Sequence, residues 1–236
     1  MTLLYKWNAT APDVELLRTD NPTEIAAELQ TLGVRYDRWA TKELADDADQ
    51  DAVLAAYAEE VRRISEEENF VTVDVARLRD TGQPDFAATA KGAREKFLDE
   101  HTHADDEVRF FVEGSGTFYL HIDDTVYGVV CEAGDLLSVP EGATHWFDMG
   151  VNDPQFCAIR FFHDGEGWVG DFTGRRSPPP SPATTNSSPE SSTHDHPAPP
   201  QRHRPRHRGH HVLDVVRPRH PLPLLPGAFR RDPVAP

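Results

Sequence analysis

Four potential metal ligands in two short segments constrain this chain more than any other feature. The first segment begins at Glu100 and contains His101, His103 and Glu107, and the second contains His145. Alternate residues of a strand point to the same face, so His101 and His103 are predicted to converge, and Glu107 has the same parity. The ~40 residues before His145 suffice for two or three hairpin strands that bring it alongside.

These four residues, hereafter the ligand cluster, form a set of protein ligands for one divalent ion per chain. If that ion is six-coordinate, two positions remain for water or substrate. Such an open set favours a redox-active or octahedral metal over a structural zinc, which would be tetrahedral and closed. Iron is the first choice, and nickel, manganese and cobalt are compatible because affinity order alone does not distinguish them.

Helical periodicity dominates the first part of the chain, and short strands dominate the region that carries the ligands. Asn21 and Pro22 begin a helix that ends at Gly33, a longer helix is predicted over 47–68, and 91–99 is interpreted as a short helix. We expect a mainly β fold with N-terminal helices, an antiparallel barrel or sandwich. Its strands are predicted over 2–7, 34–39, 70–78, 110–112, 117–122, 126–130, 136–139, 146–149 and 156–162.

The composition changes after Gly174. Residues 175–236 contain fifteen of the twenty prolines and seven of the twelve histidines, and no lysine. Sequence of this kind cannot support a packed core, so we expect one domain over 1–174 and a disordered tail over 175–236. A composition rich in Arg, His and Pro is typical of a GC-rich coding region translated in the wrong frame. Our hypothesis is that the tail is a frameshift or readthrough product, and a metal or nucleic-acid role for its His-Arg run is the weaker alternative.

The charge distribution argues against nucleic acid and membranes as partners. The tail has ten arginines against four acidic residues, a charge of +6. The formal charge of the whole chain is −16, so the first 174 residues carry a charge of −22. Such an acidic body would repel both polyanions. Two cysteines, no apolar leader and no run of ~18 apolar residues predict a reduced, cytoplasmic protein, and we expect a monomer.

The two segments resemble the two motifs of the cupin superfamily, and the resemblance implies a double-stranded β-helix or jelly-roll barrel. Glu95 stands where the first motif normally has glycine, and Met149 stands where the second normally has asparagine, but neither position is a ligand. The residues that match the motifs are His101, His103, Glu107, Gly114, Gly134, Pro140, Gly142 and His145.

Within that superfamily, residues 1–174 resemble the acireductone dioxygenases. The segments Glu-His-Thr-His-x3-Glu-Val-Arg-Phe-Phe-Val-x-Gly, His-Trp-Phe-Asp, Ala-Ile-Arg-Phe-Phe and Glu-Gly-Trp-Val-Gly-Asp-Phe-Thr-Gly carry the likeness. It implies cleavage of 1,2-dihydroxy-3-keto-5-methylthiopentene by O2, as part of methionine salvage. An Fe(II) form would give formate and 4-methylthio-2-oxobutanoate, and a Ni(II) form would give formate, carbon monoxide and 3-methylthiopropionate.

Three further residues are candidates for catalysis. Arg109, two residues past Glu107, can stabilise enediolate oxygens, unless it serves a structural carboxylate. Phe147, two residues past His145, can press on the flat substrate or can be an ordinary core residue. Asp105 has the parity of a general base.

Four other residues near the ligand cluster have weaker interpretations. Glu100 has the wrong parity for a ligand and is a candidate to orient a ligand histidine. Trp168 could close the pocket or could simply pack. His121 and His163 are interpreted as ordinary core or surface histidines.

Two other functions remain open. One is a different metal cupin enzyme, such as a sugar-phosphate isomerase or another dioxygenase. The other is a non-catalytic cupin that binds a small ligand or stores metal.

Overall fold

The computed structural model describes residues 1–165 and 169–174 and the backbone of residues 214–215. Its helices are α1 Pro22–Gln30, α2 Gln50–Ala56, α3 Ala58–Glu68 and α4 Phe86–Phe97. Its strands are β1 Leu3–Asn8, β2 Ala11–Thr19, β3 Arg35–Arg38, β4 Thr72–Leu78, β5 His101–Thr102, β6 Glu107–Ile122, β7 Thr125–Glu132, β8 Asp135–Val139, β9 His145–Asp148, β10 Phe156–Phe162, β11 Asp171–Phe172 and β12 Asp214–Val215.

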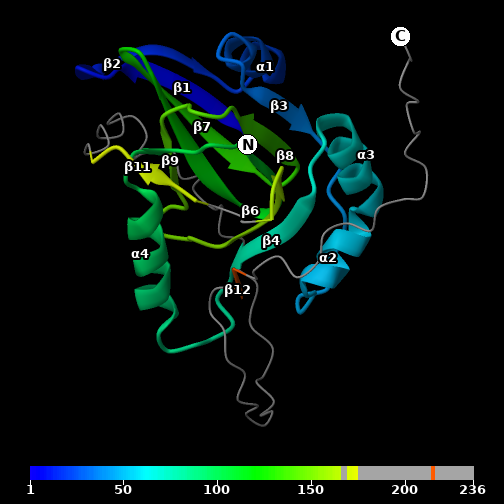
Figure 1. The fold of residues 1–236 in the computed structure, drawn as a ribbon. Coiled ribbons are helices and arrows are strands. Elements are labelled where there is room, and N and C mark those ends of the chain that lie inside the picture. The colour runs from blue at the N-terminus through cyan, green and yellow to red at the C-terminus, as the bar shows by residue number, and fades with distance from the viewer. Residues whose placement is uncertain (166–168, 175–213, 216–236) are drawn as a thin grey trace, which may run out of the picture.

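Two antiparallel sheets share the long strand β6 (Figure 1). The β1 sheet has the order β2-β1-β7-β6-β9-β5-β11, and the β4 sheet has the order β3-β8-β6-β10-β4-β12. β6 changes sheets near Gly114, which has a φ of 70° and pairs with Phe156. A Cβ atom at Gly114 would lie 2.1 Å from the carbonyl oxygen of Gln155, so the bend requires glycine.

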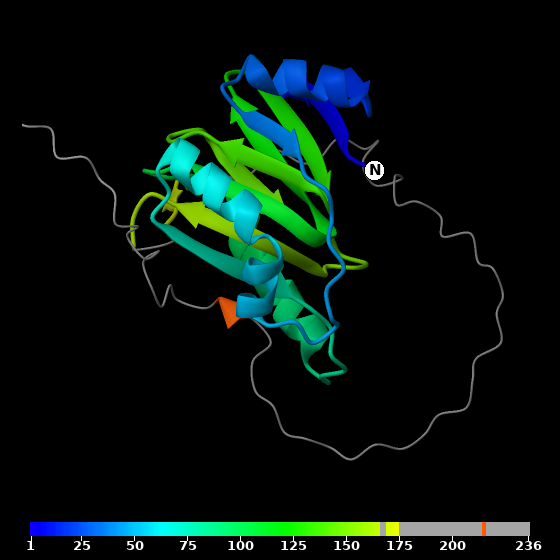
Figure 2. The same cartoon turned by 90° about the vertical axis from the view of Figure 1, so that its right-hand side faces the viewer.

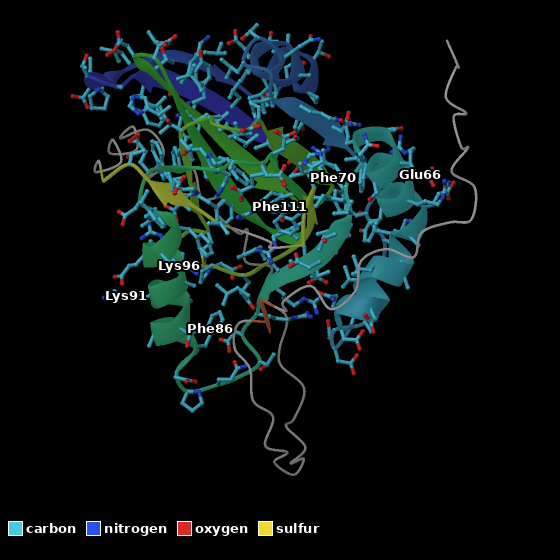
Figure 3. All side chains as sticks on the ribbon, viewed as in Figure 1. Glu66, Phe70, Phe86, Lys91, Lys96 and Phe111 are labelled. Carbon is cyan, nitrogen blue, oxygen red and sulfur yellow. The ribbon has the colours of Figure 1, made fainter. Side chains whose placement is uncertain are left out.

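The interior between the sheets is apolar, and Phe111 lies within it (Figure 3). A second cluster forms where α2 and α3 cover the outer face of the β4 sheet, as Figure 2 shows. There Tyr57 and Ile64 pack with Phe110 and Phe161, and burying each large apolar side chain contributes about 1.5–3 kcal/mol. α4 lies on the opposite side from α2 and α3 (Figure 1).

The mainly β architecture with helices before most strands is confirmed, but several predicted boundaries are wrong. The helix predicted over 47–68 is two helices, because Tyr57 leaves helical geometry and its hydroxyl accepts a hydrogen bond from the backbone N of Lys42 at 2.9 Å. α4 begins at Phe86 instead of residue 91, since Phe86, Ala90 and Ala93 form its buried face.

Two strand predictions also need correction. The strands predicted over 110–112 and 117–122 are parts of the single strand β6, because its Gly-Ser-Gly segment bends without leaving the ladder. Strand β2 was missed, since it lies at a sheet edge with Val14 and Leu16 exposed.

The predicted disorder of 175–236 concerns residues outside the described part of the chain, except for the backbone of β12. That strand pairs with β4, Asp214 opposite Arg77 and Val215 opposite Ala76. In the part of the chain that the structure describes, no helix has the length and apolar character needed to cross a bilayer.

Candidate metal centre

Three short stretches of backbone, from both sheets, bring the ligand cluster together. His101 in β5 is paired directly with His145, the first residue of β9. Glu107 begins β6 and pairs there with Val139 of β8 in the β4 sheet, while Leu120, farther along β6, pairs with His145. The chain turns through residues 103–106 instead of continuing as a strand, so the expected parity holds for His101 and His103 but a turn delivers Glu107.

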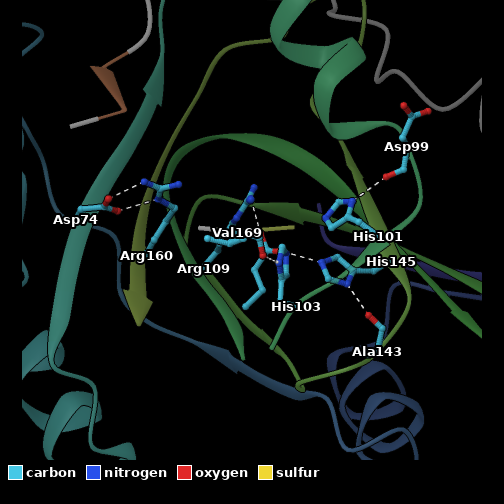
Figure 4. Close-up of polar contacts among 10 residues, drawn as sticks. Asp74, Asp99, His101, His103, Arg109, Ala143, His145, Arg160 and Val169 are labelled. Atoms are coloured by element: carbon cyan, nitrogen blue, oxygen red, sulfur yellow. Dashed lines mark hydrogen bonds and ion pairs between the residues drawn. The ribbon is translucent and has the colours of Figure 1, made fainter. Parts of the chain in front are cut away.

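The donor atoms of the cluster face a common point. One atom from each of the four residues can be chosen so that all four lie within 4.8 Å of one another. The Oε2 atom of Glu107 lies 3.0 Å from the Nε2 atom of His103 and 2.7 Å from that of His145. All four side chains are nearly buried, and the three imidazole rings converge in Figure 4.

Each imidazole is held by a backbone carbonyl at its other nitrogen. The Nδ1 atoms donate to Asp99 O at 2.7 Å, Val169 O at 2.6 Å and Ala143 O at 2.8 Å, for His101, His103 and His145 respectively. A carbonyl only accepts, so each Nδ1 carries a proton and each Nε2 faces the centre, where it can bind an ion once it carries no proton of its own. This is the second layer of hydrogen bonds that orients metal-ligating histidines.

Electrostatics favour the ligand forms of His101 and Glu107 but oppose that of His103. Burial lowers the pKa of His101 to about 4, so this ring is neutral at neutral pH. Burial raises the pKa of Glu107, but the charge of Arg109 and the hydrogen bonds from His103 and His145 outweigh it and hold that pKa well below its ordinary value. Burial lowers the pKa of His103, but the hydrogen bond and charge of the Glu107 carboxylate outweigh it and raise that pKa, so a cation competes with a proton for this ring.

Arg109 lies beside the cluster, as its spacing from Glu107 predicted. Its Nη2 atom forms an ion pair with Glu107 Oε1, and its guanidinium carbon lies 4.7 Å from the ring centre of Phe147. Its Nε–H is buried and has no hydrogen-bond acceptor among the described residues. Phe147 is itself buried in the core between Phe118 and Phe156, so the structure places it against Arg109.

A cavity next to Arg109 was not predicted from the sequence. Its wall contains a second guanidinium, Arg160, which makes a bidentate ion pair with buried Asp74 at 2.8 and 2.6 Å. Arg160 stands directly between Arg109 and Asp74 on adjacent strands (Figure 4). The rest of the lining is mainly apolar and consists of Ala76, Arg77, Leu78, Ala93, Phe97, Met149 and Phe156. The sequence does contain one sign of this polar wall, because Arg160 is the single charged residue in the otherwise apolar segment Phe156–Phe162.

Two residues proposed near the ligands have other partners. The Asp105 carboxylate accepts from the backbone N of His163 at 2.9 Å and also contacts His163 Nδ1, so it does not join the ligand cluster. The buried Glu100 carboxylate lies 3.2 Å from His121 Nδ1, which is not one of the ligand histidines. Glu100 is not among the four residues whose donor atoms converge. Trp168 lies outside the described residues.

Comparisons with known proteins agree with this geometry. The ARD/ARD' family matches residues 4–170. Acireductone dioxygenase 1 of Nocardia farcinica is 54% identical over 175 residues, which are 74% of this chain and 92% of the relative. Acireductone dioxygenase of Saccharopolyspora erythraea is 52% identical over 172 residues, 73% of this chain and 90% of the relative.

A solved structure extends the likeness to three dimensions. It is an acireductone dioxygenase from Bacillus anthracis with a cadmium ion in its active centre, at 32% identity and a TM-score of 0.61. The match covers 73% of this chain and 98% of that one. The expected cupin barrel is thereby confirmed.

Proposed function

The chain belongs to the ARD/ARD' family and is an enzyme of the acireductone dioxygenase class, and from this premise we propose that the ligand cluster is its metal site. This proposal rests on one observation: three Nε2 atoms and one carboxylate converge, and all are buried and within 4.8 Å of one another. The donor set fits a divalent ion of iron or nickel type, one per chain. A bound ion would supply a Lewis acid and a template for an enediol and O2.

The charges next to the ligand cluster suit a substrate that becomes anionic. Three arginines line one cavity: Arg77 pairs with Glu113, Arg160 makes a bidentate ion pair with Asp74, and Arg109 pairs with the proposed ligand Glu107. The unpaired Nε–H of Arg109 is a buried donor that an enediolate oxygen would satisfy. We assign Arg109 to binding and orienting the ionised enediol, and Phe147 to holding the guanidinium in place.

The apolar part of the cavity suits the methylthio end of the acireductone 1,2-dihydroxy-3-keto-5-methylthiopentene. Ala93 and Phe97 from α4 face Leu78 and Phe156 from the β4 sheet across this space. Apolar walls with a few convergent polar groups are the usual form of a small-ligand site. The oxygens would then lie toward Arg109 and the thioether away from it.

The identity of the ion decides which products are proposed. With Fe(II) we expect formate and 4-methylthio-2-oxobutanoate, which would serve methionine salvage, and with Ni(II) formate, carbon monoxide and 3-methylthiopropionate. We further place the reaction in the cytoplasm of a cell and in a monomer, a setting that suits the free, buried thiols of Cys131 and Cys157.

The test is metal loading under anaerobic conditions, followed by addition of acireductone and then O2. We expect substrate absorbance to disappear with O2 uptake, and carbon monoxide to form with nickel only. An isomerase of the same fold would change the substrate without taking up O2, and a non-catalytic cupin would bind metal and leave the substrate intact. No loss of absorbance with either ion would exclude the dioxygenase assignment.

A further inference from the structure

His163, the residue that follows β10, connects three segments of the chain. Its backbone N donates to Asp105 Oδ2 at 2.9 Å, and its Nδ1 contacts Asp105 Oδ1. Its Nε2 lies 3.0 Å from the carbonyl oxygen of Glu68 at the end of α3. Its ring centre lies 4.6 Å from that of Phe70. His163 therefore contacts both carboxylate oxygens of Asp105, the atoms that would otherwise act on a substrate.

The chemistry of these contacts selects the protonated ring. A carboxylate and a carbonyl only accept hydrogen bonds, so both ring nitrogens must donate, which requires an imidazolium. Burial lowers the pKa of His163, but the hydrogen bond and charge of Asp105, the Glu68 carbonyl and the charge of Asp106 outweigh it, and the pKa is raised.

The other charges around His163 are accounted for. The Glu68 carboxylate pairs with Arg35 of β3, and an Asp106 carboxylate oxygen accepts from the backbone N of Glu141 at 2.8 Å. Asp164 is the next residue along the chain, and Phe70 contributes an uncharged ring. The surroundings of the ring are therefore acidic, which suits a cation.

We propose that His163 is a positioning residue that fastens the turn 103–106 to the C-terminal end of α3 and thereby keeps His103 and Glu107 in ligand geometry. Asp105 is the middle of that turn, two residues from each ligand, and it has no regular strand pairing to hold it. The inference rests on the proposed metal role of the cluster.

An exposed ion pair alone would not explain this arrangement. The side chains of His163 and Asp105 are 36% and 29% exposed, and pairs of that kind contribute little to global stability. The contact acts locally, because it holds the turn 103–106, which lies between strands β5 and β6 and belongs to neither. His163 thus serves to keep His103 and Glu107 in position and contributes little to the stability of the whole fold.

The experiment measures release of Ni(II) from the loaded, full-length chain into excess chelator, between pH 6 and pH 9. We expect His163→Leu and Asp105→Ala each to accelerate release about three- to tenfold, as for loss of a part-exposed charged hydrogen bond. The double variant should release no faster than either single one. The ratio of variant to wild-type rate should be largest at low pH and fall toward one as the imidazolium deprotonates.

The matched control is Lys91→Gln, which removes the exposed pair with Glu95 on α4 and should leave the rate unchanged. Nitrogen-15 spectra of the wild-type ring should show both nitrogens protonated at neutral pH. A neutral ring, or release from His163→Leu at the wild-type rate, overturns the proposal. Failure of the wild type to retain Ni(II) would instead overturn the proposed function.

Discussion

At the scale of single residues, the site depends on which nitrogen of each imidazole faces the common centre. Three backbone carbonyls fix the Nδ1 protons, so the Nε2 atoms are presented without any reorganisation of the rings. Two of these carbonyls lie two residues from their histidine, whereas His103 depends on Val169, 66 residues away. The orientation of His103 is therefore the part of the site most dependent on tertiary structure.

Arg109 is expected to act on the substrate and not on the ion. Arg109→Met should retain the metal and lower kcat about 10²- to 10³-fold, because a buried donor aimed at developing charge is lost. His145→Ala, by contrast, should lose the bound metal. Metal analysis and turnover on the same samples check both variants, and normal turnover in both would refute the site assignment.

The pH dependence of the metal-free protein should report His101. Its pKa is about 4 when folded and 6.5 as the ordinary value, so between these values the unfolded chain binds a proton that the folded chain does not. Stability therefore falls as pH drops through this window, by about 3 kcal/mol from this residue alone.

Urea unfolding at pH 7 and pH 4 of the wild type and His101→Gln measures this contribution. The wild type should lose more stability than the variant over that interval. Equal losses would show that the buried ring is not neutral in the folded protein.

At the scale of elements, β6 organises the molecule because it belongs to both sheets and begins with Glu107. Close to its bend, a Cβ atom at Gly116 would lie 2.3 Å from the ring of Phe147. We expect Gly116→Ala to displace that ring and to cost about 1–3 kcal/mol of unfolding free energy, as overpacking usually does.

Gly92 in α4 is the matched comparison for Gly116, since a Cβ atom there would meet nothing within 4 Å. Gly92→Ala should leave stability equal or raise it by ~1 kcal/mol, because alanine favours a helix. Denaturant midpoints of the two variants decide the point, and equal midpoints would mean that the Phe147 ring adapts without cost.

The elements also show what the sequence could predict. Strand parity correctly related His101 to His103, and motif spacing correctly brought in Glu107 and His145. Parity offered Asp105 as a candidate base but could not show that the turn at 103–106 directs its carboxylate to His163. The cavity wall escaped prediction because Arg160 and Asp74 meet only through the pairing of β10 with β4. Pairing between segments far apart in sequence leaves no local pattern.

At the scale of the whole molecule, the family match ends at residue 170, four residues before the composition changes. We expect a chain that stops after Gly174 to bind metal and turn over like the full chain, because the ligand cluster and cavity lie within residues 74–169. Parallel metal titration and kinetics test this, and loss of either property would assign the tail a role.

The frameshift hypothesis for that tail is a separate matter of coding sequence. Sequencing around codons 174–180 should reveal an alternative frame with a nearby stop. An intact frame without one would remove the hypothesis and leave the enzyme assignment unaffected.

We propose that one ion, held by three histidines and Glu107, makes this acidic barrel a dioxygenase. The most direct test is to titrate metal-stripped protein with Fe(II) without oxygen and to measure O2 consumption with acireductone at each step. We expect O2 consumption to rise in proportion to bound iron, to saturate at one ion per chain, and to be absent in His145→Ala. Full consumption by stripped protein in the presence of chelator, or unchanged iron binding in that variant, would contradict it.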